Sequence, residues 1–188
     1  AIRNVDELIV GKLISPEVTG VYKLIKLISA LLSKVIEPMY IVIYPEFNRL
    51  LSHGKTSELK NMLRRISRIT IIASIIFISI CALVGELSIN YFSENYSSVY
   101  YWSLMIYVVG MAFNMVFFFA HPLAISLGLE LFVLKGNVAL GVFYIVMLWL
   151  LGSYLGLMGI CISTSLYILL SAVFRLWGSV NKFKGLYE

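Results

Sequence analysis

Residues 18–44, VTGVYKLIKLISALLSKVIEPMYIVIY, decide the fold, because they form an apolar, helix-compatible stretch of membrane length that nevertheless carries four charges. The charged residues are Lys23, Lys26, Lys34 and Glu37. At about 100° per residue of an α-helix, the four side chains share an arc of about 80°. The rest of the helix surface is apolar or small, so one face of the predicted helix is polar.

The polar face should not contact lipid, because a lysine at the centre of a membrane helix costs roughly 2.5 to 3.5 kcal/mol. Lys23 and Glu37 lie near the ends of the stretch, where long side chains can reach the membrane surface. Lys26 and Lys34 lie within about 6 Å of its midpoint and need a polar surrounding. We interpret the three lysines as the lining of a substrate pathway. For Lys34 an alternative stays open, namely pairing with Glu37 three residues further on.

The composition is that of a membrane protein. Of 188 residues, 60% are hydrophobic and 13% are charged, and the mean hydropathy is +0.91. We predict an all-α polytopic membrane protein that forms one six-helix bundle over residues 1–188. The predicted helices cover residues 1–15, 18–44, 69–85, 99–125, 132–151 and 157–178, with an interfacial amphipathic helix at 56–68. The first helix is too short to cross a bilayer, so we expect a fragment that starts inside a helix.

Basic residues are distributed unevenly between the loops. Nine Lys and Arg fall in residues 45–68, 126–135 and 179–188, and none falls in 15–18, 86–98 and 152–156. By the positive-inside rule, the basic loops and the C-terminus are cytoplasmic. The amphipathic helix 56–68 should then lie along the cytoplasmic surface and contact anionic lipid headgroups. We expect no nucleic-acid partner, because no binding module accompanies these charges.

Two further charged residues belong to the first predicted helix. Asp6 lies about 13 Å along the helix from Ser15, close to the membrane middle, and shares one arc with Arg3 and Glu7. We assign Arg3 to the substrate pathway and Asp6 to ion coupling. Solvation of these charges is the alternative for Asp6.

Glu37 and His121 are the other candidates for ion coupling, since a carboxylate and an imidazole can both exchange protons. His121 near a helix end is also explained as an ordinary interfacial histidine. Pro38 should break or kink the helix 18–44 and is a hinge candidate, although many membrane helices contain prolines without a gating role.

Several motifs that would indicate an enzyme are missing. The sequence contains no phosphate-binding glycine loop, no nucleophile elbow and no metal-ligand cluster. Cys81 and Cys161 lie inside apolar runs and read as small buried side chains. We therefore expect no catalytic residues, no metal site and no cofactor.

A series of short motifs follows in a characteristic order. They are NVDELIVGK at 4–12, SPEVTGVY at 15–22, Pro38, YPEF at 44–47, the basic helix 56–68 and GLMG at 156–159. In this order the chain resembles the polysaccharide repeat-unit (O-antigen type) flippases of the multidrug, oligosaccharidyl-lipid and polysaccharide exporter superfamily. The resemblance covers nearly the whole chain.

The resemblance implies the C-terminal half of a twelve-helix transporter built from two bundles, with the N-terminal six-helix bundle as its missing partner. It also implies translocation of an undecaprenyl-pyrophosphate-linked oligosaccharide, a step of lipopolysaccharide biosynthesis, across the bacterial inner membrane by alternating access. Other polysaccharide assembly proteins would be further partners. Two alternatives are a multidrug exporter of the same superfamily, which the three lysines disfavour, and a membrane-embedded polysaccharide-assembly enzyme, which the short loops disfavour.

Overall fold

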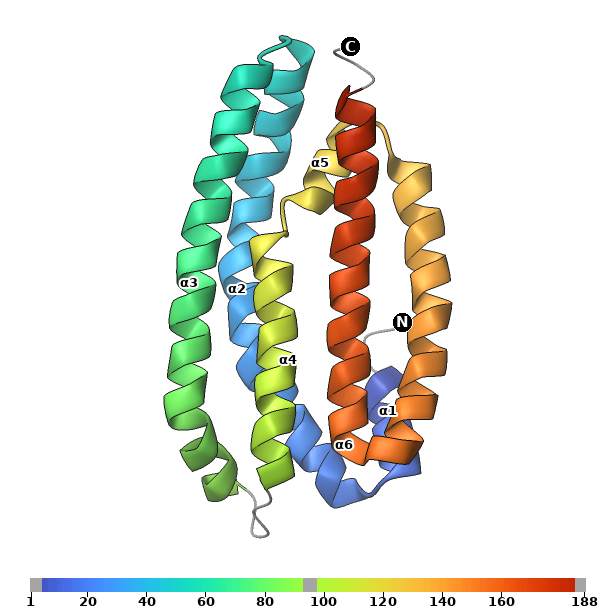
Figure 1. The fold of residues 1–188 in the computed structure, drawn as a ribbon. Helices are drawn as coiled ribbons and strands as arrows, with labels where there is room; N and C mark the ends of the chain where they lie inside the picture. Colours follow the sequence, from blue (N-terminus) through green and yellow to red (C-terminus); the bar gives the residue numbers. More distant parts are fainter. Residues whose placement is uncertain (1–4, 93–97, 185–188) are drawn as a thin grey trace.

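The protein is all-α. The computed structural model describes residues 5–92 and 98–184, so Arg3 lies outside the described residues. The helices are α1 Val5–Leu13, α2 Pro16–Ser52, α3 Thr56–Phe92, α4 Ser98–Val116, α5 Ala120–Ser126 and α6 Glu130–Lys184. In Figure 1 the long helices stand side by side, and the α2–α3 turn, α5 and the last turns of α6 lie at one end. We call this end, which holds the basic segments, the basic end.

Four helical stretches in the described part of the chain are long and apolar enough to cross a membrane. They are Pro16–Ser52, Thr56–Ile89, Ser98–Ser126 and Glu130–Phe183. The prediction of an all-α protein with membrane-length helices is confirmed at this level. The helix boundaries differ from the predicted ones in three places.

The first difference concerns α2, which does not end near Tyr44. The helix continues through Pro38 and Pro45 to Ser52. A proline inside a helix lacks one N–H donor but does not always end the helix. The expected break at Pro38 is therefore wrong, and a hinge at this residue stays a prediction.

The second difference concerns the basic segment 56–68, which is not a separate helix. It forms the first part of α3, a continuous helix of 37 residues. Leu59 and Ile66 are buried and pack in one core with Phe47 and Leu50 of α2. Burial of this apolar face against α2 holds the segment in an antiparallel hairpin (Figure 1).

The third difference concerns the predicted helix 99–125, which divides into α4 and α5. The helix is interrupted at residues 117–119 and resumes at Ala120. Pro122 cannot donate a hydrogen bond to the carbonyl of Phe118 four residues earlier. The Tyr40 hydroxyl of α2 donates to this carbonyl instead, at 3.2 Å. The carbonyl group that the interruption leaves free therefore has a hydrogen-bond donor from another helix.

Helix α6 folds back on itself at Gly156. Gly156 has φ 58° and ψ −135°, a backbone conformation that suits glycine. The two halves of α6, residues 130–155 and 157–184, run antiparallel in Figure 1. Phe132 and Phe174 stack across them with ring centroids 4.3 Å apart. The two predicted helices 132–151 and 157–178 correspond to these halves.

Two hydrophobic cores lie along the bundle. One core, at the basic end, joins α2, α3, α4 and α5 through residues such as Phe47, Leu59 and Phe118. The other core, at the opposite end, contains Val10 of α1 and Leu157 of α6 and surrounds the beginning of α2. The second core positions the site described next.

Candidate functional site

The turn between α1 and α2 brings the first charged residues of the chain onto α2. Ser15 is the N-cap of α2, and its side chain accepts a hydrogen bond from the N–H of Val18. Pro16 occupies the first turn, where its missing N–H costs nothing. Because α2 reverses the direction of α1 at this cap, residues before and after it lie at matching depths. Asp6, nine residues before Ser15, therefore meets Lys26, eleven residues after it.

Lys26 is held by two carboxylates. Its Nζ atom lies 3.1 and 3.0 Å from the two carboxylate oxygens of Asp6 and 3.0 Å from Oε1 of Glu7. Tyr22, one helical turn before Lys26, donates its hydroxyl to Oδ2 of Asp6 at 2.8 Å. The Lys26 ammonium also lies 6.0 Å from the centre of the Tyr22 ring. We call Asp6, Glu7, Tyr22, Lys23 and Lys26 the α1–α2 charge cluster.

The cluster is buried mainly on its Asp6 side. Asp6 is only 7% exposed and Tyr22 is fully buried. The Tyr22 ring makes an edge-to-face contact with Tyr107 of α4, with centroids 6.1 Å apart. Tyr144 of α6 is also buried, and its hydroxyl is hydrogen-bonded to Thr164 at 3.2 Å. Three tyrosines from three helices thus lie in the interior at this end of the bundle.

Among the residues that the structure describes, the charges of the cluster balance. Lys23, which is more exposed, lies 3.9 Å from Glu7 and adds a second positive charge to that of Lys26. Two carboxylates and two ammonium groups sum to zero when all four are ionised. Buried charges are tolerated when they are paired and hydrogen-bonded. Pairing explains how an apolar helix carries lysine at this depth.

Lys34 and Glu37 form a separate ion pair. Their side chains approach to 3.2 Å and are 72% and 55% exposed. Apolar residues of the same helix are also exposed beside them, among them Leu31 and Ile41. The polar arc of residues 18–44 is therefore split. Its Lys26 part is paired with α1, and its Lys34 part is on the open surface of α2.

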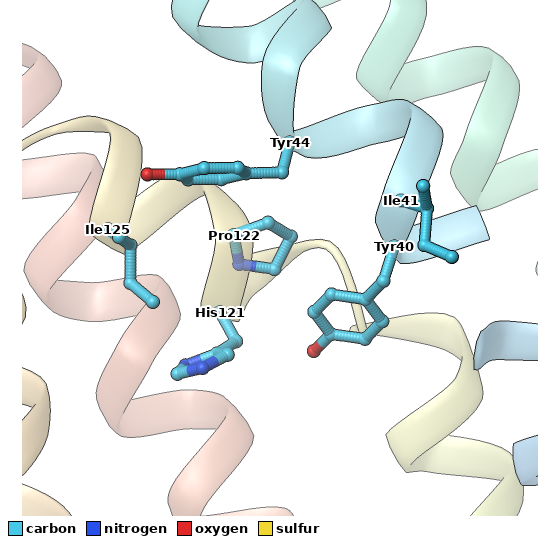
Figure 2. A pocket seen from close by; sticks show the side chains of 6 residues that line it. All are labelled: Tyr40, Ile41, Tyr44, His121, Pro122 and Ile125. Atoms are coloured by element: carbon cyan, nitrogen blue, oxygen red, sulfur yellow. The ribbon is translucent and has the colours of Figure 1, made fainter. Parts of the chain in front are cut away.

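His121 lies in a pocket near the basic end, between α2 and α5 (Figure 2). The pocket has a volume of about 420 Å³ and is lined by Tyr40, Ile41, Tyr44, His121, Pro122 and Ile125. Within the described residues, the buried Nδ1 atom of His121 has no hydrogen-bond partner. The His121 and Tyr40 rings lie 6.3 Å apart. This pocket is distant in the fold from the α1–α2 charge cluster, which belongs to the other core.

The structure brings together some of the predicted residues and leaves others apart. Asp6, Lys23 and Lys26 meet in the cluster, whereas Lys34 with Glu37, and His121, lie elsewhere. Glu7 and the tyrosines at positions 22, 107 and 144 were not predicted as site residues. A usable signal existed for Tyr22, which lies four residues before Lys26 on the same helix face. The sequence around Tyr107 and Tyr144 gives no indication that these side chains lie in the interior at the same end of the bundle as the cluster.

The donor set does not favour a metal. Across residues 5–92 and 98–184, no group of three or more His, Cys, Asp or Glu side chains is placed to hold an ion. Comparison of the chain with protein-family models, curated proteins and solved structures finds no match.

Proposed function

We propose that this protein is a transporter that moves an undecaprenyl-pyrophosphate-linked oligosaccharide repeat unit across the bacterial inner membrane by alternating access. The motif resemblance motivates the choice of cargo. The observation that carries the proposal is the α1–α2 charge cluster, a balanced set of charges at membrane depth inside an apolar bundle. A purely structural bundle gains little from such a cluster, because well-packed apolar residues are usually as stable as a buried ion pair.

The cluster suits ion coupling. Protonation of Asp6 would remove one of the two carboxylates that hold Lys26 and would leave Glu7 to pair with both Lys26 and the more exposed Lys23. A partly buried ammonium group that has lost one of its two counter-charges favours a conformation in which it is hydrated or bound to an anion. Proton binding at Asp6 and the position of α1 on α2 are therefore linked. Glu37 and His121 remain candidates for the same role at other places along the pathway.

The open face of α2 suits a substrate cavity. Lys34 and Glu37 lie exposed inside the membrane-length part of α2, where lipid would be a poor neighbour for them. A second helical bundle facing this side would enclose an aqueous cavity lined by Lys34, and by Lys23 closer to the α1 end. Each of these lysines is paired with a glutamate, and a pyrophosphate that displaces the glutamate would gain the ammonium group as its counter-charge. The proposed partner is the N-terminal six-helix bundle that the resemblance implies.

The competing functions predict other charges. A multidrug exporter for cationic compounds would need accessible acidic groups, whereas Asp6 and Glu7 are engaged by lysines. A polysaccharide-assembly enzyme would need catalytic groups on a loop, and the loops between the described helices are short. The assay described next can also detect either of these functions.

The test is a flipping assay with the protein, together with its partner bundle, in liposomes that contain a labelled undecaprenyl-pyrophosphate oligosaccharide. We expect Lys34→Ala to slow translocation about tenfold, equivalent to ~1.4 kcal/mol in the barrier. Lys55→Ala is the matched control, because Lys55 also forms an exposed pair with a glutamate three residues on, Glu58, but outside the apolar stretch. The control should translocate normally.

Three results would count against the proposal. Wild-type protein that transports a cationic dye and leaves the lipid-linked glycan in place would indicate the exporter. Lengthened glycan chains in the same liposomes would indicate the enzyme. Equal rates for Lys34→Ala and Lys55→Ala would remove the cationic cavity from the mechanism.

A further inference from the structure

A second hollow lies on the outside of the bundle, between α3 and the turn that joins α4 to α5. Its volume is about 560 Å³, and it is lined by Leu63, Arg64, Ser67, Arg68, Ile71, Ile72 and Phe119. Six of these seven residues come from consecutive turns of α3. We call it the α3 groove.

The two arginines of the α3 groove carry uncompensated charge. Two other cations of the same hairpin are paired, Arg49 with Glu46 and Lys55 with Glu58. In the part of the chain that the structure describes, neither Arg64 nor Arg68 has an ion-pair partner. They stand one helical turn apart on one face, where like charges repel. An anion between them would relieve this repulsion.

The rest of the α3 groove is apolar. Ile71 and Ile72 are about half exposed and follow the arginines along the helix. Phe119 lies across from them in the turn between α4 and α5. Along the axis of α3 the lining begins with Leu63, continues with the two arginines and Ser67 between them, and ends with the two isoleucines. A ligand that fills the groove has an anionic head and an apolar tail.

The position of the groove along α3 matches a membrane boundary. Arg68 and Glu86 enclose 17 residues without a charge, 69–85, which span about 26 Å of helix, close to the thickness of the hydrocarbon core. Arg68 is therefore at the level of the lipid headgroups, and Ile71 and Ile72 are at the level of the first acyl carbons. By the distribution of basic residues this is the cytoplasmic leaflet.

We propose that the α3 groove binds an anionic phospholipid. The phosphodiester lies between the Arg64 and Arg68 guanidinium groups, with Ser67 beside it, and an acyl chain lies against Ile71, Ile72 and Phe119. Basic pockets on the cytoplasmic side of membrane helices recognise lipid headgroups by this chemistry. The bound lipid would bridge α3 to the α4–α5 turn. The inference goes beyond the proposed function and does not depend on it.

The experiment measures lipid binding to the purified full chain by native mass spectrometry, with phosphatidylglycerol and phosphatidylcholine offered in the same detergent. We expect phosphatidylglycerol to bind preferentially. Arg64→Gln and Arg68→Gln should each weaken binding about fivefold. Arg65→Gln is the matched control, because it removes the same charge from the same turn without lining the groove, and it should change binding less than about twofold.

The apolar half has its own control pair. Ile72 lines the groove and Ile76 does not, although their exposures are 53% and 54%. We expect Ile72→Ser to weaken phosphatidylglycerol binding and Ile76→Ser to leave it unchanged. Thermal unfolding of each variant without lipid checks that the fold is intact.

Three results would overturn the proposal. Equal losses in Arg64→Gln and Arg65→Gln would indicate diffuse attraction to the basic surface. Displacement of the lipid by inorganic phosphate or glycerol phosphate would indicate a site for a free anion. Equal binding of phosphatidylcholine would show that the groove does not select for the negative charge of the lipid. None of these measurements requires transport, so a failure here and a failure of the flipping assay are distinguishable.

Discussion

Lys26 is a basic residue in an apolar helix, and its contacts stabilise the charge of its side chain there. Its ammonium group has two carboxylates at about 3 Å, and Asp6 in turn accepts a hydrogen bond from buried Tyr22. Lys34 has the same chemistry and a similar depth, but its pair with Glu37 is exposed. The same residue type therefore contributes differently at two positions of one helix.

We expect Lys26→Met to lower the free energy of unfolding by about 3 to 5 kcal/mol, because it leaves buried Asp6 without its counter-charge. Lys34→Met should change it by less than about 1 kcal/mol, as is usual for an exposed pair. Chemical unfolding in a mild detergent measures both values.

A second substitution separates the ion pair from other effects of Lys26. Adding Asp6→Asn to Lys26→Met should restore part of the lost stability, since the unpaired charge is then gone. If the Lys26 and Lys34 variants were equally stable, Lys26 would not be held by a buried network.

At the scale of the elements, helix breaks and close helix contacts are stabilised by residues of a second helix. The gap between α4 and α5 follows from Pro122, but the free carbonyl it leaves is satisfied by Tyr40 of α2. The close approach of α4 to α6 depends on Gly110, where an added Cβ would lie 2.7 Å from Cβ and 2.9 Å from Cα of Ser165. Each of these features is stabilised by a contact between two helices.

Tyr40→Phe should loosen the α4–α5 turn, because the carbonyl of Phe118 loses its donor. The cost of the lost hydrogen bond is about 1 kcal/mol, or roughly a fivefold rise in local opening. Hydrogen exchange should show it as faster exchange confined to peptides covering 117–124. Tyr44→Phe, another tyrosine of the same pocket, is the control. Unchanged exchange in Tyr40→Phe would argue against this role of the hydroxyl.

Gly110→Ala should destabilise the protein by about 1 to 3 kcal/mol, because the new methyl group overlaps Ser165 and pushes α4 away from α6. Gly141→Ala is the control, since nothing lies within 4 Å of its added Cβ. There the better helix propensity of alanine should stabilise by up to about 1 kcal/mol. Thermal unfolding compares the two, and a stable Gly110→Ala protein would contradict the close packing.

At the scale of the whole molecule, the two ends differ in charge and in core. The basic end carries the α2–α3 turn, α5 and the end of α6, and the opposite end carries the α1–α2 turn and the fold-back between the two halves of α6 (Figure 1). This arrangement agrees with a chain whose helices cross a membrane in alternating directions. Labelling of introduced cysteines tests how the bundle is oriented in the membrane.

We expect the basic end to face the cytoplasm. Ser57→Cys in α3 should react with a membrane-impermeant maleimide only in inside-out vesicles, and Ser153→Cys, near the fold-back of α6, only in right-side-out vesicles. The native cysteines Cys81 and Cys161 are buried and give a low background. The reverse labelling pattern would invert the topology and, with it, the leaflet assigned to the lipid groove.

Much of the fold could be predicted from the sequence because it depends on local properties. Apolar runs of membrane length predict helices wherever they occur, and Gly156 marks a reversal between two such runs. The helix ends were less predictable. Pro38 and Pro45 lie inside α2, and the basic segment 56–68 joins α3, because packing between α2 and α3 outweighs the local signals.

The amino-acid sequence alone predicts helices of membrane length, with charges on one face of residues 18–44. Hydropathy and helical period are enough for that conclusion. Which of these charges meet depends on how the helices are arranged in the folded protein. The cap at Ser15 reverses the chain, so that Asp6 and Glu7 reach Lys26 at the same depth, whereas no element covers Lys34 and Glu37 in the described structure. Pairing between helices depends on their relative placement, which no local pattern encodes.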